Sequence, residues 1–528
     1  MEGSPSARTA NAAEKHSKHP VSMILIFNIL REKTSGVKRH LKLVCVLLLS
    51  APAILTASVE LILHGSTLTL RAHDASLYDI LSAFAAYGIT VDAQPGIQSR
   101  FNGDLTDTHI DAALDRILRQ HPHNTTWREI PYGRGFLRVL SGIQVYAPEH
   151  SDTDPLLRIA PGPPRIRQLP GGEAYLADEI LLGMRPGTDA DRFRRLLASM
   201  GGQVISVHPQ TGIYRIRLPQ NTNLPALLGS LADEDSIAIA EPNFVYTLPA
   251  PHARETAPSV ASGPSHSFRP PADGHPALAI IDSGVTPSRL PGDILRASRD
   301  ITGANLPLED PAGHGTHMAL IAAGLSTTPD GTASGDAVPL VSIRGFDADG
   351  NTHTYGLLEG LAFAAESGAR VVSMSWGAYT ESAILARAFQ QASDQGLILL
   401  ASAGNDGENR LMFPAAYPSV IAVGAAAADG TREAYSNYGP GLDLLAPGTA
   451  ILAEGETQRL LRGTSMATPR VAAALTTYLH LHPDTSPADA LQHLRERLTV
   501  VETSGNETPG LFDEAARARF LGVDPNDQ

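Results

Sequence analysis

Three short blocks in the second half of the chain carry the side chains that a hydrolytic triad needs. Asp282 ends an apolar run, His314 stands between two glycines, and Ser465 follows a Gly-Thr pair. A carboxylate can orient an imidazole, and the imidazole can accept a proton from a hydroxyl, which then attacks a carbonyl carbon. Acid, base and nucleophile in that order is one of three chain orders in which unrelated folds reach this geometry. The blocks therefore predict nucleophilic acyl transfer.

The three blocks resemble those of the subtilase family of serine endopeptidases, and the resemblance runs from about residue 276 to residue 520. It implies that Asp282 fixes the tautomer of His314 and that His314 acts first as general base and then as general acid. Ser465 would be the nucleophile that forms an acyl-enzyme intermediate. In the family's His-Gly-Thr-His block the first histidine acts, so His317 is not the predicted base.

A fourth block, residues 401–407, is similar to the family segment that supplies an oxyanion-hole amide. Asn405 would donate from its side chain, and Ser465 would donate from its backbone N–H. Taken alone, an Asn-Asp-Gly sequence is more typical of a turn. The position of Asn405 between His314 and Ser465 favours the oxyanion role.

The resemblance also predicts where the substrate backbone lies. A peptide would add as a β-strand beside residues 375–377. Trp376 stands where relatives have leucine and is either bulk in an outer subsite or part of the core. No charged side chain lines the expected pocket, so we expect apolar residues before the scissile bond, with Ala416 narrowing the pocket floor. The predicted substrate-binding residues are Ser375, Trp376, Gly377, Ser402, Ala403, Gly404 and Ala416.

The elements that must position these residues follow an alternating pattern. Apolar runs such as 277–281 and 371–374 alternate with helical patterns such as 354–366 and 465–478. Fully apolar strands alternating with helices indicate a parallel sheet with helices on both faces. The predicted fold class is α/β, with a subtilisin-like parallel sheet over residues 274–522 preceded by two small α+β domains.

Residues 174–248 are similar to the subtilase propeptide, with the closing sequence Glu-Pro-Asn-Phe-Val-Tyr at 241–246 as the most specific feature. Pro- and Gly-rich linkers are expected at 149–173 and 249–273. We expect this propeptide to inhibit the enzyme and to be released by self-cleavage in the second linker. The alternative is a permanent accessory domain.

The first 148 residues indicate export. A basic flank and an apolar run make residues 1–57 an N-terminal extension with a signal peptide, the alternative being an uncleaved membrane anchor. Residues 58–148 resemble the secretin/TonB short N-terminal domain, which implies an envelope protein as partner; the alternative is an unrelated α+β spacer. The Gly-Asp-Leu-Thr sequence at 103–106 is expected to form a turn there. We expect a periplasmic or secreted protein of a Gram-negative-type bacterium.

Composition narrows the partners and cofactors. The net charge of −14, from 41 basic and 55 acidic residues, argues against nucleic acid as a partner. The single cysteine, Cys45, excludes intrachain disulfides and a thiolate metal site. We expect no cofactor; residues 326–331 lie where many relatives bind calcium but offer one carboxylate, so no metal is assigned. The sequence thus predicts a self-processed serine endopeptidase, and the alternative is an inactive scaffold of the same fold that acts through residues 58–148.

Overall fold

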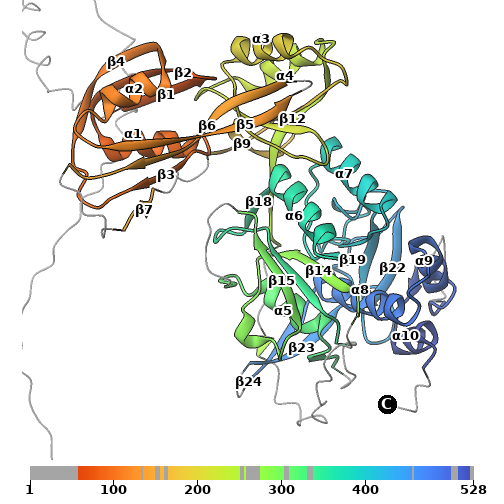
Figure 1. Cartoon of the computed structure of the whole chain (residues 1–528). Coiled ribbons are helices and arrows are strands. Elements are labelled where there is room, and N and C mark those ends of the chain that lie inside the picture. The colour runs from red at the N-terminus through yellow and green to blue at the C-terminus, as the bar shows by residue number, and fades with distance from the viewer. Residues whose placement is uncertain are drawn as a thin grey trace, which may run out of the picture. The chain divides into compact units, whose positions relative to one another are not determined.

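The computed structural model describes most of the chain beyond residue 57 (Figure 1). The predicted signal peptide lies outside the described residues. No helix of the described part is both long and apolar enough to span a bilayer. The described residues are 58–132, 135–148, 155–159, 165–249, 255–256, 274–302, 309–329, 337–454, 457–500 and 509–523.

The C-terminal domain is built on a sheet in which all neighbouring strands are parallel. This confirms the predicted α/β fold class. In spatial order the strands are β15 (Leu295–Asp300), β17 (Leu340–Arg344), β14 (Ala277–Asp282), β19 (Ala369–Met374), β20 (Ile398–Ser402), β21 (Ile421–Ala426), β22 (Leu442–Pro447) and β25 (Gly510–Leu511).

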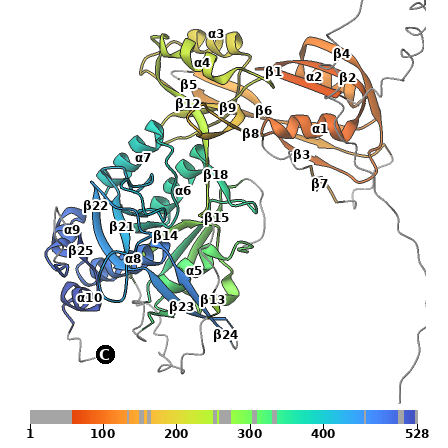
Figure 2. The ribbon, with the colours of Figure 1, turned by 180° about the vertical axis from the view of Figure 1, so that it is seen from behind.

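Different helices cover the two faces of this sheet (Figures 1 and 2). Leu278 and Ile280 of β14 pack in one core with α5 (His314–Ala322), α8 (Thr464–Leu481), α9 (Pro487–Arg495) and α10 (Glu514–Leu521). Ala279 and Ile281 pack in another core with α6 (Thr354–Glu366) and α7 (Ala383–Asp394). Successive side chains of a strand point to opposite faces, so the unbroken apolar run of β14 serves both cores.

A small antiparallel sheet flanks the main sheet, in the order β13 (Glu255–Thr256), β24 (Thr457–Arg462), β23 (Thr449–Glu454) and β16 (Ser326–Thr327). β13 falls within the linker predicted at 249–273 and pairs with β24. The 3-10 turn Pro287–Arg289 follows β14.

The segment predicted as a propeptide forms an antiparallel sheet with two helices, α3 (Ala190–Met200) and α4 (Leu224–Ala232). Its last strand, β18, belongs to the C-terminal domain, so the sheet continues from one domain into the next. The strand order is β10 (Gln203–Val207), β11 (Ile213–Arg217), β9 (Ala174–Met184), β12 (Ile237–Thr247) and β18 (Asn351–His353), with β8 (Ile166–Gln168) pairing β9.

The N-terminal domain has two sheets and the helices α1 (Leu77–Ala86) and α2 (Ile110–Ile117). The prediction of a turn at 103–106 is wrong, because these residues lie inside β4 (Arg100–His109), where 103–105 pair with β2 (Thr67–Ser76). The linker expected at 149–173 contains two short strands, β7 and β8, which pair with β3 and β9. The first sheet has the order β1 (Ser58–His64), β2 (Thr67–Ser76) and β4 (Arg100–His109). The second has the order β5 (His123–Tyr132), β6 (Gly135–Val145), β3 (Thr90–Ala93) and β7 (Leu157–Arg158).

Candidate active site

Asp282 and His314 form a hydrogen-bonded pair at the carboxyl end of β14. The Nδ1 atom of His314 lies 2.7 Å from Oδ1 of Asp282. A carboxylate at this point can only accept, so Nδ1 carries the proton and Nε2 is left as an acceptor. The same carboxylate oxygen accepts from the backbone N–H of Ser283 at 2.8 Å, which fixes its position.

A buried carboxylate that sequence reasoning did not assign holds the helix that begins at His314. Asp310 accepts from the backbone N–H of Gly313 at 2.9 Å and from both the N–H and the hydroxyl of Thr316 at 2.7 Å. The N-cap, Gly313, has no side chain to do this. Asp310 therefore positions the first turn of α5. Its place four residues before His314 was the only sequence signal for this role.

Ser465 is the second residue of α8, so its side chain lies at a helix N-terminus, where negative charge is stabilised. Its hydroxyl donates to the carbonyl oxygen of Ser375 at 3.0 Å, and the Ser375 hydroxyl donates back to the carbonyl of Ser465 at 3.1 Å. Among the described residues no hydrogen bond joins the Ser465 hydroxyl to His314. The serine is buried and its hydroxyl must turn away from Ser375 to reach an imidazole.

Asn405 lies beside the start of α8 in an orientation that its contacts fix. Its Oδ1 atom accepts from the backbone N–H of Thr464 at 2.9 Å and from the Thr464 hydroxyl at 3.0 Å. A backbone N–H can only donate, so this atom is the oxygen and the amide Nδ2 faces the other way. The loop that carries Asn405 is held by Asn437, whose Oδ1 accepts from the N–H groups of Asp406 and Glu408 at 3.0 Å.

The predicted pocket walls lie on two neighbouring strand ends, with a residue between them that sequence reasoning did not assign. A Cβ atom on Gly377 would lie 2.8 Å from Cβ of Met412, and one on Gly404 would lie 3.0 Å from its Cγ. The N–H of Met412 also donates to the carbonyl of Ala403 at 3.0 Å. Met412 therefore lies against both walls, and the N–H of Ala416 donates to the Met412 carbonyl at 2.9 Å.

Trp376 is part of the core in this structure. Its indole N–H donates to the carbonyl of Ile281 at 2.9 Å, and the side chain is 1% exposed. The ring contacts Phe346 at 5.6 Å and Tyr246 of β12 at 6.0 Å between centroids. The propeptide strand therefore supplies part of the apolar surroundings of Trp376.

The electrostatics of the pair favour a base. Burial lowers the pKa of His314, but the charge of Asp282 and the hydrogen bond that His314 donates to its carboxylate raise it more, so the net shift is upward. A raised pKa lets the imidazole take up a proton readily, and activity that needs neutral His314 should fall as pH drops through that value.

Metal ligands do not gather elsewhere in the described part of the chain, which has no group of three His, Cys, Asp or Glu side chains able to hold an ion. Of the loop considered for calcium, residues 330–331 lie outside the described residues.

Comparisons with known proteins agree with this fold. Residues 274–516 match the model of the subtilase family, and residues 161–243 match that of the fervidolysin N-terminal prodomain. The chain is 31% identical over 244 residues to subtilisin BL from Lederbergia lenta, covering 46% of this chain and 90% of that protein. It is 30% identical over 291 residues to subtilisin E from Bacillus subtilis, covering 53% of this chain and 76% of that protein.

The solved structure of fervidolysin from Fervidobacterium pennivorans aligns with a TM-score of 0.53 at 21% identity, covering 68% of this chain and 63% of that one. At this identity the likeness speaks for the fold. The subtilisin relatives and the match to the subtilase family model show that the chain belongs to the subtilase family. It is a subtilisin-like serine endopeptidase with a prodomain.

Proposed function

We propose that the chain is an exported, self-processing zymogen that hydrolyses peptide bonds through Asp282, His314 and Ser465. The observation that carries the proposal is the bonded Asp282–His314 pair at the ends of β14 and α5, with Ser465 opening the adjoining helix α8. α5 and α8 pack against each other in one core beneath the same face of the sheet. The bonded Asp282–His314 pair also disfavours the inactive scaffold, because a scaffold without activity would not need a carboxylate that orients an imidazole.

In the proposed reaction, Nε2 of His314 takes the Ser465 proton while Oγ attacks the carbonyl carbon of the substrate. The carbonyl π bond breaks and its electron pair moves to the oxygen, which becomes an oxyanion. Nδ2 of Asn405 and the backbone N–H of Ser465 would donate to that oxygen. His314 then gives the proton to the leaving amine, and water repeats the sequence on the acyl-enzyme to release the acid and restore Ser465.

The prodomain would inhibit by anchoring its last strand on the catalytic domain next to the segment where substrate is expected to add, since Tyr246 lies 6.0 Å from Trp376 between ring centroids. β12 pairs antiparallel with β18, with Tyr246 opposite Thr352, and the N–H of Leu248 donates to the carbonyl of Gly350 at 2.9 Å. Main-chain pairing of this kind is how an extended peptide gains affinity without a particular sequence. We propose self-cleavage between Thr247 and Pro276, after which the prodomain remains bound until it is removed.

Two side chains of β12 dock the prodomain on helix N-termini of the catalytic domain. Glu241 accepts from the Ser382 hydroxyl and from the backbone N–H of Ala383 at 3.0 Å, at the start of α7. Asn243 accepts from the N–H of Tyr355 at 3.1 Å, in the first turn of α6. Helix N-termini carry unpaired donors and positive partial charge, so both contacts favour docking.

The proposal extends to localisation and partners. The basic and apolar pattern within residues 1–57 supports a signal peptide, and the periplasm or the medium as destination. The N-terminal domain would bind an envelope protein. The substrates would be proteins or peptides, and the chemistry would need no cofactor.

Labelling with a fluorophosphonate probe tests the proposed nucleophile. The wild-type protein should be modified at Ser465, as located by peptide mass spectrometry, and Ser465→Ala should not be modified. Labelling of the wild-type protein at another serine would overturn the assignment of Ser465, and no labelling after the prodomain is removed would favour the inactive scaffold.

A further inference from the structure

The prodomain sheet ends in an irregular edge strand, β10, which is buried to half-buried in the whole chain. β10 pairs only with β11 within the described sheet. Its register with β11 shifts between Val204 and Ser206, so Ile205 bulges out of the ladder. A bulge leaves the extra residue without its ladder partner, and an unprotected edge is prone to opening and to pairing with other chains.

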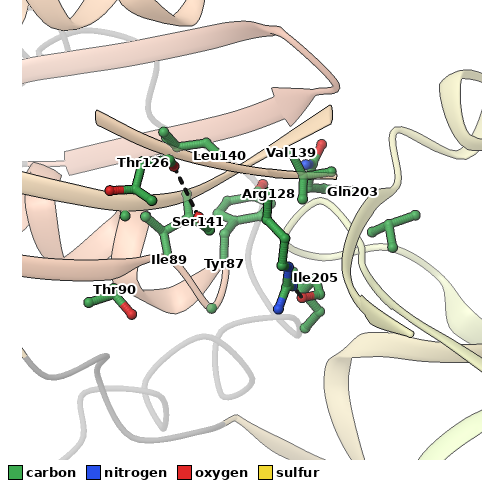
Figure 3. A pocket seen from close by; sticks show the side chains of 13 residues that line it. Tyr87, Ile89, Thr90, Thr126, Arg128, Val139, Leu140, Ser141, Gln203 and Ile205 are labelled. Atoms are coloured by element: carbon green, nitrogen blue, oxygen red, sulfur yellow. Dashed lines mark hydrogen bonds between the residues drawn. The ribbon is translucent and has the colours of Figure 1, made fainter. Parts of the chain in front are cut away.

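The N-terminal domain supplies the missing partners. Nη2 of Arg128, on β5, donates to the carbonyl oxygen of Ile205 at 2.9 Å (Figure 3). The N–H of Gly65 donates to Oε1 of Gln203 at 3.0 Å. Gly88 approaches so closely that a Cβ on it would lie 3.5 Å from Cβ of Ile205. All three contacts fall on the bulged edge strand.

Apolar side chains of the β5–β6 hairpin join the prodomain core. Ile130 and Val139 are buried in the cluster that contains Val204 and Tyr214 of the prodomain. The rest of the N-terminal domain has its own separate core. The hairpin therefore buries part of its apolar surface against the prodomain, which stabilises both domains.

The contact between the two domains is only partly filled by apolar side chains. A cavity of about 360 Å³ lies along it, lined on one side by Tyr87, Ile89 and Leu140 and on the other by Gln203 and Ile205 (Figure 3). An interface of this kind can be weakened by single substitutions while each domain keeps its own core.

The strand that the hairpin holds also touches the catalytic domain. The hydroxyl of Tyr355, on α6, donates to the Ser206 hydroxyl at 2.8 Å. On the next strand, Arg215 binds Glu179 at 2.7 Å, and Glu179 accepts from Asn243, which bonds to the first turn of α6. Loss of order in β10 would therefore loosen groups that dock the prodomain.

We infer that the N-terminal domain is the second component of the inhibitor: its β5–β6 hairpin holds edge strand β10 and thereby tightens the prodomain on the catalytic domain. After self-cleavage the two small domains would stay together as one inhibitory segment. The inference rests on the proposed zymogen function, because only an inhibitory prodomain gives this contact a consequence for activity.

The test uses the full chain and two readouts. The first is hydrogen exchange of β10 and β11 in the Ser465→Ala background, where no cleavage occurs. The second is latency: self-cleaved protein is diluted and the concentration at which peptidase activity appears is measured. Arg128→Ala and Val139→Asp are the interface variants. Arg138→Ala is the control, because Arg138 lies on the same hairpin but stacks over the Trp127 ring at 4.6 Å.

We expect Arg128→Ala to speed hydrogen exchange in β10. It should also raise the concentration at which peptidase activity appears on dilution by roughly tenfold, for the loss of one charge-assisted hydrogen bond. Val139→Asp should do more, and Arg138→Ala should change neither readout. Faster exchange without a change in latency, or no change in either, would overturn the inference. A different outcome is a wild-type protein that is active at every concentration while hydrogen exchange in β10 still responds to Arg128→Ala. That result would overturn the proposed zymogen function, and the inhibitory role of the hairpin would be overturned with it.

Discussion

Two buried glutamates on neighbouring strands of the prodomain have opposite kinds of bonding partners. Glu179, on β9, is 1% exposed and meets Arg215 and Arg217 at 2.7 Å. Glu241, on β12, is 8% exposed, and its hydrogen bonds come from the hydroxyl and backbone N–H groups at the start of α7 in the catalytic domain. One carboxylate completes its bonding within its own domain, and the other completes it across a domain boundary.

Their pKa values differ accordingly. Burial alone would raise the pKa of Glu179, but the two arginine charges lower it well below its usual range. Burial raises the pKa of Glu241 to about 7, because the hydrogen bonds from α7 compensate only in part. Glu179 is therefore a permanent structural charge, whereas Glu241 is a docking group whose charge changes near neutral pH.

The comparison extends to the active site. Asn405 has its oxygen satisfied by Thr464 and leaves its amide donor for another acceptor. Asn437 instead uses both ends on the protein, accepting from Asp406 and donating to the Tyr379 hydroxyl at 3.1 Å. A side chain with one end left open suits binding or catalysis, and one with both ends used holds a loop.

The largest effect on stability should follow from removing Glu179 from its cluster with Arg215 and Arg217. Glu179→Ala leaves Arg215 and Arg217 without their carboxylate, which should destabilise the prodomain by about 3–5 kcal/mol. Chemical unfolding of the Ser465→Ala chain, with hydrogen exchange to follow the prodomain, would measure this. Glu234→Ala is the control: Glu234 pairs with Arg192 at a solvent-accessible site, and the loss of such a pair should cost far less stability. Equal losses in the two variants would remove the distinction between the two kinds of carboxylate.

Asn405→Ala should lower kcat by roughly 10²–10³-fold with little change in KM, because its amide would serve the charged transition state. Steady-state kinetics on a peptide substrate would show this. Asn437→Ala should act differently, by lowering the stability of the loop as well as activity. An unchanged kcat in Asn405→Ala would make Asn405 a turn residue.

The docking carboxylate should make inhibition depend on pH. The docked pKa of about 7 lies above the ordinary value of 4.5, so docking takes up a proton and is strongest in acid. Inhibition should weaken by roughly 10- to 100-fold as pH rises from about 5 to 7, between the ordinary and the docked pKa, and should level off above about 7. Glu241→Gln keeps the acceptor and cannot titrate, so its inhibition should vary much less.

This pH dependence is measured as the latency of self-cleaved protein relative to fully activated enzyme at each pH, which cancels the titration of His314. A wild-type profile as flat as that of Glu241→Gln would contradict the assignment of Glu241 as a titrating docking group.

The smallest effect concerns the pocket. Met412→Gly should open the space between Gly377 and Gly404 and raise the preference for a large over a small apolar residue before the scissile bond by about tenfold, at roughly 1–3 kcal/mol per accommodated methylene. Peptide-library profiling would measure it. Ala416→Gly is the comparison, and a larger shift there than in Met412→Gly would restore Ala416 as the determinant of pocket size.

The sequence predicted the framework because local pattern carries it. The apolar run at 277–281 became β14, and the helix expected at 465–478 became α8 (Thr464–Leu481). Asp310 and Asn437 went unassigned because their roles depend on backbone groups that only the folded loops bring together. The docking role of Glu241 was equally hidden, since its partners at Ser382 and Ala383 are more than a hundred residues away. The turn expected at 103–106 failed because pairing with β2 outweighs the local preference of Gly and Asp.

The central claim, that Ser465 cleaves the chain's own connector after the prodomain, is tested most directly by intact-mass analysis and N-terminal sequencing of the purified full-length protein with time. The wild-type protein should convert to a form that begins between residues 247 and 276, and Ser465→Ala should remain uncut under the same conditions. Conversion of Ser465→Ala at the wild-type rate, or a fully active wild-type protein that keeps its prodomain covalently attached, would contradict the account.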